Sequence, residues 1–377
     1  MKETFKLTDQ GGRKLALRFD LTVPLARYVA MNPFLKMPFK RYQMEKVYRD
    51  GPIKLGRYRE FWQCDVDIVG SSSMLAEAEV FDLVFTVFKE LGLNIVIEFN
   101  NRKVLDGVLE FAGVPENKRN EAMIVIDKFK KLSKAELEEE FTKAGIAEDV
   151  FVKIMGLLES AGRSNQGILE NLSRFVTSEK GREGIAELNE LLSYLKALGI
   201  DEKKCRLNPS LARGLSYYTG PVFEGFLENA EEAGITSSLC GGGRYDDMIG
   251  KYIGEDKVIP ATGISFGLEP ITEVLKLELK ELKKTMTRVY VIPINTISES
   301  LKIVKIIREN NVNAEIDISG KGISKNLDYA NSLGIPYVIF IGQDELAQSK
   351  IKLRNMETGK ESMLTVGECV QALKEGK

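Results

Sequence analysis

The chain has 377 residues, of which 44% are hydrophobic and 29% are charged, a composition typical of a soluble globular protein with two or three domains. Its formal net charge of −2 excludes a strong overall field, so a polyanion would have to bind to a local cationic patch. The sequence contains no histidine, which excludes Ser-His-Asp and Cys-His nucleophiles, a histidine general base and a histidine-ligated zinc site. Catalysis would therefore depend on carboxylates, arginines, lysines, tyrosines, backbone groups or the substrate itself.

The sequence also predicts the cellular location of the protein. No apolar run approaches the roughly 18 residues that a membrane helix needs, and the N-terminal stretch MKETFKLTDQ lacks the apolar core of a signal peptide. The cysteines form no CxxC pair and are typical of thiols in a reducing compartment; they are Cys64, Cys205, Cys240 and Cys369. We therefore expect a cytoplasmic protein without a membrane partner.

The first part of the chain is predicted to form strands around helices. Residues 14–31 begin as a strand and continue as a helix. The segments 39–50 and 58–70 alternate apolar and polar side chains, as paired strands do, and the Asp-Gly-Pro turn between them predicts a long hairpin loop. Residues 73–92 have the period of an amphipathic helix, and residues 94–101 are predicted to form a strand.

The remaining sequence predicts an insertion, a return to strands and a second domain. From about residue 102 to 200 the pattern is helical and rich in charge. Strands return in the segments 216–228, 237–250 and 262–271. A lysine-rich stretch then marks a linker, beyond which strands and helices alternate, as in a small α/β domain. We therefore predict domains at 1–277 and 288–377, joined by a linker at 278–287.

A cationic hairpin loop is the first candidate for a ligand site. The planar guanidinium of arginine suits phosphate oxygens, and Phe61 on the following strand offers a face for a stacked base. The cations of the loop are Arg49, Lys54, Arg57 and Arg59. A solvated loop without a ligand is equally compatible with this composition.

Two carboxylates lie on the strand that follows the loop. Asp65 and Asp67 are expected to point to the same face, because side chains alternate along a strand. Two carboxylates on one face are commonly the solvent side of a strand, so this pattern alone identifies no site.

Two further stretches are candidates for a site. In LARGLSYYTGPVFEGF, at most one of Tyr217 and Tyr218 is expected to line a given pocket, because neighbours in a strand face opposite sides. An ordinary β-hairpin with aromatic packing is the alternative. In CGGGRYDDMIG, three glycines let the backbone approach a ligand closely or bend sharply, although the spacing matches neither GxGxxG nor a Walker loop.

Taken together, the motifs resemble the catalytic domain of class II histidyl-tRNA synthetases, in the archaeal and eukaryotic style. The similar stretches are LALRFDLTVPLARYVAMN, YRDGPIKLGRYREFWQCDVDIVG, ARGLSYYTGPVFE, GGGRYDDMIG and GISFGLE, of which ARGLSYYTG is the most specific. PYVIFIGQDELAQSKIKLRNMETGK resembles the anticodon-binding domain shared with the glycine, threonine and proline enzymes. The resemblance covers nearly the whole chain. It implies an α+β fold, with an antiparallel sheet flanked by helices, a helical insertion and a C-terminal α/β domain.

The resemblance implies a ligase that attaches L-histidine to its tRNA through a histidyl-adenylate, using ATP and the Mg²⁺ that accompanies the nucleotide. The implied partners are L-histidine, ATP, the acceptor end and anticodon of histidine tRNA, and a second copy of the chain in a homodimer. The carboxylate of the substrate is the nucleophile of the first step. This agrees with a chain that has no histidine.

Site residues are implied in the same way. The implied catalytic cations are Arg49 and Arg213. The implied histidine-binding residues are Asp20, Thr22, Gln63, Asp67, Tyr217 and Tyr218, with Asp67 and Tyr218 on the two imidazole nitrogens. The implied ATP-binding residues are Arg49, Asp50, Arg57, Phe61, Gly242 and Gly267, and no residue is assigned to a metal.

Three departures from the family pattern stand out. Pro270 occupies the position of the arginine that ends motif 3, whose loss would weaken ATP binding by about 1–3 kcal/mol. Ser216 stands where many members have an aspartate. The sequence begins at the strand after motif 1, so we expect the dimer-forming helix of the family to be absent, which argues against the homodimer.

An alternative from another class is a catalytically weakened paralogue. A regulatory subunit of ATP phosphoribosyltransferase generally lacks an anticodon domain, which this sequence is predicted to have. A sensor of uncharged tRNA would keep tRNA binding while losing ATP residues, and Pro270 fits that pattern. Histidine-dependent exchange between ATP and pyrophosphate distinguishes these alternatives from the synthetase.

Overall fold

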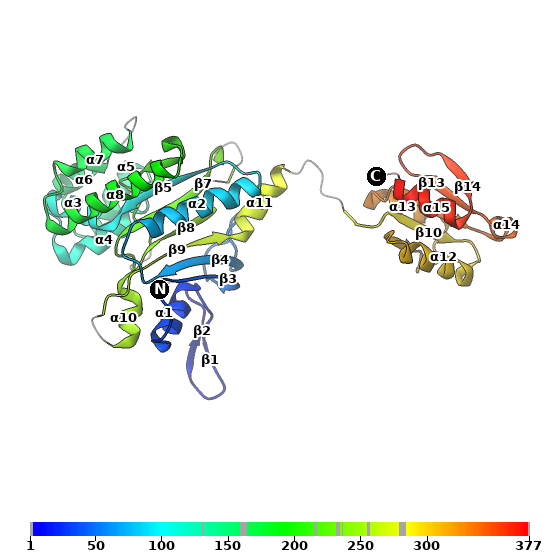
Figure 1. Ribbon diagram of the computed structural model, residues 1–377, viewed down its shortest axis with the longest axis horizontal. Helices are drawn as coiled ribbons and strands as arrows, with labels where there is room; N and C mark the ends of the chain where they lie inside the picture. Colours follow the sequence, from blue (N-terminus) through cyan, green and yellow to red (C-terminus); the bar gives the residue numbers. More distant parts are fainter. Residues whose placement is uncertain are drawn as a thin grey trace. The chain divides into compact units, whose positions relative to one another are not determined.

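The computed structural model describes residues 3–129, 132–158, 164–214, 217–230, 234–235, 237–254, 257–278 and 284–375. The chain divides into two compact units, residues 1–278 and 279–377, whose elements are labelled in Figure 1. Ser216 and residues 279–283 of the predicted linker lie outside the described residues. The predicted domain boundaries stay a prediction.

A seven-stranded sheet forms the centre of the first unit. Its strand order is β3-β4-β9-β8-β7-β5-β6, and all neighbours are antiparallel except the pair β5–β6. The strands are β3 (Phe39–Tyr48), β4 (Glu60–Val69), β5 (Ile95–Asn101), β6 (Cys205–Leu207), β7 (Pro221–Leu227), β8 (Cys240–Arg244) and β9 (Ala261–Gly267). The predicted antiparallel sheet is therefore confirmed, with β4 between β3 and β9.

Helix α2 (Leu75–Glu90) packs along one face of this sheet (Figure 1). The ring of Phe81 contacts those of Phe99 and Phe223, and the ring of Phe88 contacts that of Phe266, so α2 is joined to three strands through aromatic packing. Helix α11 (Leu268–Glu278) continues directly from β9 and places Ile271 and Val274 in the same core.

A smaller apolar cluster holds two further helices together. It joins α1 (Thr22–Met31) to α10 (Asp247–Ile253), with Leu25, Val29 and Ile249 among its members. Both helices carry site residues at their start or just before it. Their packing therefore fixes one wall of the cavity described below.

The predicted helical insertion is confirmed. It consists of α3 (Arg102–Ala112), α4 (Glu116–Ile126), α5 (Lys134–Lys143), α6 (Glu148–Leu158), α7 (Asn165–Ser173) and α8 (Glu179–Ala197), followed by the 3₁₀-helix η1 (Glu202–Lys204). These helices share one continuous core with α2 and the sheet. The insertion is thus part of the first unit and not a separate body.

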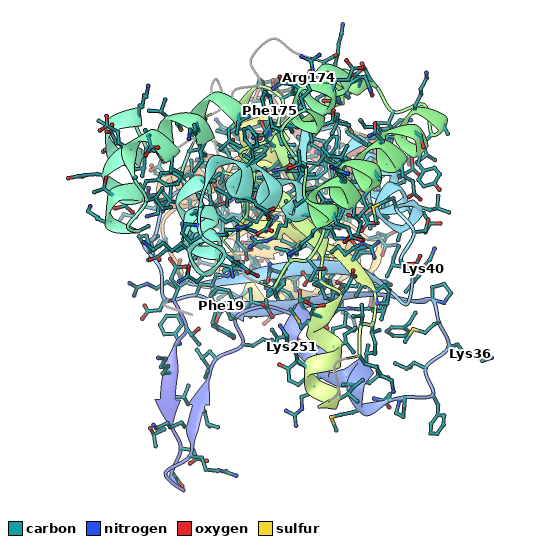
Figure 2. All side chains as sticks on the ribbon, turned by 90° about the vertical axis from the view of Figure 1, so that its left-hand side faces the viewer. Phe19, Lys36, Lys40, Arg174, Phe175 and Lys251 are labelled. Carbon is teal, nitrogen blue, oxygen red and sulfur yellow. The ribbon has the colours of Figure 1, made fainter. Side chains whose placement is uncertain are left out.

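The N-terminal strands β1 (Lys6–Thr8) and β2 (Lys14–Ala16) form a ribbon that projects from the body, with Phe19 at its base (Figure 2). The strand predicted from residue 14 is confirmed, whereas its partner β1 was not predicted. No helix within the described ranges has the length and hydropathy of a membrane span.

The second unit is a small α/β structure around a five-stranded sheet of order β11-β10-β12-β13-β14. Its strands are β10 (Val289–Pro293), β11 (Ala314–Ile316), β12 (Tyr337–Ile341), β13 (Ile351–Asn355) and β14 (Glu361–Leu364). Its helices are α12 (Ile297–Glu309), α13 (Ile323–Leu333), α14 (Gln343–Ala347) and α15 (Val366–Glu375). β10 is parallel to β11 and β12, as strand–helix alternation predicts, while β13 and β14 add an antiparallel hairpin.

Candidate active site

The floor of the candidate site is one face of β4. Gln63, Asp65 and Asp67 alternate along this strand and are buried, with 3% of Asp65 and 2% of Asp67 exposed. The predicted shared face of the two aspartates is confirmed, and the solvent-side alternative is wrong. Because a buried carboxylate without a partner is costly, this face needs counter-charges or donors.

A polar cavity lies over β4, β8 and β9 and brings together most of the predicted residues. Those that line it are Asp20, Thr22, Arg49, Gln63, Asp67, Arg213, Tyr217, Tyr218 and Gly242. Asp50, Arg57, Phe61 and Gly267, all predicted for ATP, are not among its lining residues. The cavity therefore collects the residues predicted for the amino acid, together with both predicted catalytic arginines.

Four buried oxygen atoms of residues that line this cavity accept no hydrogen bond from any described residue. They are Asp20 Oδ2, Gln63 Oε1, Asp65 Oδ1 and Asp67 Oδ2. The amide of Gln63 has its orientation fixed, because its Nε2 donates to Ser265 Oγ at 2.6 Å and leaves Oε1 as the free acceptor. A buried acceptor without a donor costs about 1–3 kcal/mol, so these atoms favour a ligand that carries several N–H groups.

Asp67 differs from the other acceptors, because a cation and a hydroxyl group contact its carboxylate. Tyr245 donates its hydroxyl to Oδ1 at 2.6 Å, and the Arg41 guanidinium lies 3.0 Å from Oδ2. Arg41 also donates to Gln43 Oε1 at 2.6 Å and to the carbonyl oxygen of Leu21 at 3.1 Å. Burial raises the pKa of Asp67, and the charge of Arg41 opposes that rise.

Among the described residues, no cation forms an ion pair with Asp65. Burial, and after it the charge of Asp67, raise the pKa of Asp65 to about 7. The hydroxyl of Ser265, which already accepts from Gln63, acts in the opposite direction through a hydrogen bond to Asp65. At neutral pH this carboxyl is therefore balanced between its charged and neutral forms.

Arg49 is a buried cation between two aromatic rings. Its guanidinium lies 4.6 Å from the ring centre of Phe19 and 5.1 Å from that of Phe61. Burial lowers its pKa, and the charge of Asp20 opposes that shift. Its Nε has no hydrogen-bond partner among the described residues, so Arg49 offers a donor to an anion in the cavity.

Arg213 is held over the sheet by backbone contacts and by the glycines of β8. Its φ of +52° is unusual for a residue with a side chain. Nη1 donates to the carbonyl oxygen of Phe223 at 3.0 Å and lies 3.5 Å from Glu224 Oε1. A Cβ at Gly241 would overlap this guanidinium, so the glycine lets the arginine lie flat on β8.

The glycines of β8 allow protein groups within the site to approach one another closely. A Cβ at Gly242 would overlap the carbonyl oxygen of Gly263, and one at Gly243 would press on Tyr218. The predicted close approach is therefore observed, but to neighbouring strands and site side chains.

The expectation that at most one of the two tyrosines lines the pocket is wrong. Tyr217 and Tyr218 both line the cavity, with ring centres 4.8 Å apart. The expectation assumed a strand, whereas β7 begins only at Pro221, and the alternation of side chains does not hold before it.

The loop between β3 and β4 lies against the start of α11. A Cβ on Gly56 would be 3.4 Å from Pro270 Cα, and the backbone N–H of Trp62 donates to both carboxylate oxygens of Glu269 at 2.9 Å. Arg57 pairs with Glu3 at 3.1 Å. Pro270 therefore borders both the β3–β4 loop and the end of β9 at Gly267.

Sequence reasoning missed Arg41 and Tyr245 and assigned no role to Asp65 or Ser265. Arg41 pairs in register with Asp67 on the neighbouring strand, a contact that needs the strand register as well as the alternation. Tyr245 directly follows the glycine run and the buried Arg244, so its position beside a predicted motif was the available signal.

Comparisons with known proteins identify the family. A family model described as "Histidyl-tRNA synthetase" matches residues 1–271. The "Histidine--tRNA ligase 2" of Shouchella clausii is 43% identical over 96% of this chain and 83% of its own length. The chain belongs to the histidyl-tRNA synthetase family. A "Histidine--tRNA ligase 1" of Bacillus cereus is 41% identical over the same shares of the two chains.

The second unit and the solved structures agree with this membership. A model described as "Anticodon binding domain" matches residues 288–376. The crystal structure of histidyl-tRNA synthetase from Nostoc sp. PCC 7120 superimposes with a TM-score of 0.73 at 31% identity, over 99% of this chain and 86% of that one. The predicted family, fold class and ligase assignment are confirmed. The relatives named here are bacterial, and the likeness to archaeal and eukaryotic members stays a prediction.

One solved relative bears on the alternative function. A structure titled as an ATP phosphoribosyltransferase regulatory subunit/histidyl-tRNA synthetase from Bacillus halodurans C superimposes with a TM-score of 0.67 at 23% identity, over 88% of this chain and 81% of that one. At that identity the likeness shows the fold alone.

We predict that Asp65→Asn stabilises the free protein more at pH 8 than at pH 5. The folded-state pKa of about 7 lies above the usual 3.8, so the folded state binds the extra proton and loses stability as the pH rises from 4 to 7. Asparagine removes this loss, whose upper bound is about 4 kcal/mol. Urea unfolding of both proteins at the two pH values measures the difference. The control is Asp82→Asn on the exposed side of α2. An equal effect of Asp65→Asn at both pH values would contradict the shift.

Proposed function

We propose that this chain attaches L-histidine to histidine tRNA in two steps, through a histidyl-adenylate formed from ATP. The observation that carries the proposal is the cavity in which Asp20, Gln63 and Asp65 present free acceptors while Arg49 and Arg213 present cations. An amino acid supplies the missing donors, and its carboxylate and the α-phosphate of ATP supply the missing anions. Family membership supports the same reaction.

In the first step the amino-acid carboxylate attacks the α-phosphorus of ATP, and the bond from that phosphorus to the bridging oxygen breaks to release pyrophosphate. Asp20, Thr22 and Gln63 hold the α-ammonium, which keeps the carboxylate at the end of β4 nearest Arg49. Arg49 binds an α-phosphate oxygen, and Arg213 stabilises the negative charge that accumulates on phosphorus, since fixed cations in a buried site need no reorganisation. No protein base is required, because the nucleophile is already a carboxylate.

ATP enters from the mouth of the cavity. Asp50, Arg57, Phe61, Gly242 and Gly267 remain the residues proposed for it, with Mg²⁺ arriving on the nucleotide phosphates. Phe61 presents a ring beside Arg49, which supports stacking of the adenine close to the α-phosphate site. Arg57 has to leave its pair with Glu3 to reach a phosphate, a change compatible with an exposed ion pair of low strength.

In the second step the ribose hydroxyl of the tRNA attacks the carbonyl carbon of the histidyl-adenylate and AMP leaves, with a phosphate or substrate oxygen accepting the proton. The tRNA is proposed to contact the β3–β4 loop with its acceptor end and residues 288–377 with its anticodon. The match of residues 288–376 to an anticodon-binding domain supports the second contact.

The assembly and location are proposed with the activity. A cytoplasmic homodimer is expected, and the surface beside edge strand β3 supports a protein contact there. An apolar groove of about 640 Å³ runs between β3, α2 and α11, and Tyr42 and Met44 on its rim are 78% and 52% exposed. Such an exposed apolar area is typical of an interface.

A catalytically weakened sensor or regulatory subunit is the alternative. Pro270 at the end of motif 3 favours it, because a cation of the ATP site is replaced by an apolar ring. The retained Arg49 and Arg213 in one cavity favour the enzyme.

We predict that the chain exchanges pyrophosphate into ATP only when L-histidine and Mg²⁺ are present. Radiolabelled pyrophosphate incorporation measures the rate, with L-glutamine and L-phenylalanine as control amino acids of similar size. If histidine does not accelerate the exchange, the proposed synthetase activity is wrong and the tRNA sensor is favoured.

We predict that Arg213→Ala lowers the turnover of exchange about 10²- to 10³-fold, the effect of removing one fixed donor from developing negative charge. The histidine KM should change much less, because the cation acts mainly as the phosphorus becomes more negative. The matched control is Arg206→Ala on β6, which removes an exposed arginine outside the cavity. A raised histidine KM with intact turnover would make Arg213 a binding group only.

A further inference from the structure

Arg213 lies on a stretch of chain that no helix or strand holds in place. Residues 208–213 follow β6 and precede β7, and none of them belongs to a regular element. Arg213 also has a φ of +52°, a conformation that costs free energy for a residue with a side chain. Other contacts must therefore fix the backbone that carries this arginine.

Asn100 at the end of β5 supplies the first of these contacts. Its side chain is 1% exposed, and its Nδ2 donates to the carbonyl oxygens of Pro209 and Leu211 at 2.9 and 3.0 Å. Both hydrogens of one buried amide are thus used on the loop that leads to Arg213.

Arg102, two residues farther along the chain, holds the loop at Arg213 itself. Its Nη1 donates to the carbonyl oxygen of Ala212 at 3.1 Å and to that of Arg213 at 3.5 Å. Its backbone N–H donates to the carbonyl oxygen of Gly220 at 3.0 Å, just before β7. One residue therefore joins the two sides of the stretch that carries Arg213 and both cavity tyrosines.

Arg102 is a buried cation without a carboxylate partner. It is 9% exposed, and among the described residues no ion pair joins it to an acid. Burial lowers its pKa, and the charges of Asp106 and Asp127 in the helical insertion oppose that shift. Because a buried charge is costly unless hydrogen bonds satisfy it, the carbonyl groups of the loop and the guanidinium of Arg102 depend on each other.

The residue between the two anchors fixes the start of the insertion. Asn101 Oδ1 accepts from the backbone N–H of Lys103 and caps α3, and its Nδ2 donates to Glu187 on α8 at 2.6 Å. Arg102 is the first residue of α3. The helical insertion and the loop of Arg213 therefore meet at Arg102.

We infer that Asn100 and Arg102 are positioning residues for adenylation, which hold the guanidinium of Arg213 in place by binding the backbone of its loop. The inference rests on the proposed function, because it assigns both residues a role that acts through the catalytic arginine. Neither residue lines the cavity, so neither contacts a substrate there. A displacement of about 1 Å in a catalytic group can cost about 10²-fold in rate, so an anchor outside the cavity affects turnover.

The first test removes the donors of Arg102 while keeping the length of its side chain. Arg102→Met in the full chain should lower the turnover of histidine-dependent pyrophosphate exchange about 10- to 10²-fold, and should change the histidine KM less than about threefold. Arg102→Lys keeps the charge on a single nitrogen and should lose less turnover than Arg102→Met.

The matched control is Arg119→Met in the same helical insertion. The Arg119 side chain is 15% exposed, donates to the carbonyl oxygen of Val114 at 3.2 Å and pairs with Glu110 at 2.9 Å. It makes no contact with the loop of Arg213, so its loss should change turnover less than about threefold. Equal losses of turnover in Arg102→Met and Arg119→Met would overturn the inference.

A double variant separates positioning from a general structural effect. In a chain that carries Arg213→Ala, adding Arg102→Met should lower the remaining turnover less than about threefold, because Arg102 acts through a residue that is already removed. If the two losses multiply, Arg102 acts independently of Arg213 and the inference is wrong.

Amide hydrogen exchange, followed by mass spectrometry, tests the loop without reference to activity. The peptide that covers residues 208–214 should exchange faster in Arg102→Met and in Asn100→Ala than in the unaltered chain, and at the same rate in Arg119→Met. An unchanged rate in the first two variants overturns the inference. If Arg102→Met does not fold, Arg102→Lys provides the same comparisons.

The two kinds of measurement distinguish this inference from the proposed function. An unaltered chain without histidine-dependent pyrophosphate exchange would contradict the proposed function. Faster amide hydrogen exchange of residues 208–214 in the variants would then still show that Asn100 and Arg102 hold the loop of Arg213, and an unchanged rate would overturn both.

Discussion

Buried hydrogen-bond acceptors without donors are the constraint on which this site depends. Asp20, Gln63, Asp65 and Asp67 line one cavity, and each has a buried oxygen that accepts no hydrogen bond from a described residue. A folded protein tolerates such atoms only where the surrounding structure imposes them. These unpaired acceptors destabilise the protein without ligand. A ligand with matching donors removes that cost on binding, whereas a ligand of the same shape without donors does not, so the site distinguishes the two.

The surrounding structure imposes them through buried ion pairs that join the sheet to α2 and β3 to β4. Arg244 on β8 forms a bidentate salt bridge with Glu77 on α2. Its Nε and Nη2 donate to the two carboxylate oxygens at 2.8 and 2.7 Å. Arg41 and Asp67 join β3 to β4. Removing one partner of such a buried pair costs about 3–5 kcal/mol, so the sheet can hold the unsatisfied atoms between these contacts in a fixed geometry.

The sequence predicted the position of a site residue where a local pattern determines it, and failed where a long-range contact determines it. The alternation of β4 predicted that Asp65 and Asp67 share a face, because a strand fixes that from sequence alone. Their different contacts could not be predicted in this way. They follow from Arg41 and Ser265, which reach them across strand pairs separated by 26 and 200 residues along the chain. For Tyr217 and Tyr218 the prediction was wrong, because it assumed that side chains alternate as in a strand, whereas both residues precede the start of β7. The position of Arg213 required a positive φ and a neighbouring Gly241, which only the folded chain brings together.

The most direct measurement of the central claim is a crystal structure of the full chain with L-histidine bound. The account predicts the α-ammonium within hydrogen-bond distance of Gln63 Oε1 and Asp20 Oδ2, and the two ring nitrogens within that distance of Asp67 and Tyr218. Asp67 should keep its contacts with Arg41 and Tyr245. Histidine bound outside this cavity, or with its α-ammonium on neither Gln63 nor Asp20, would contradict it.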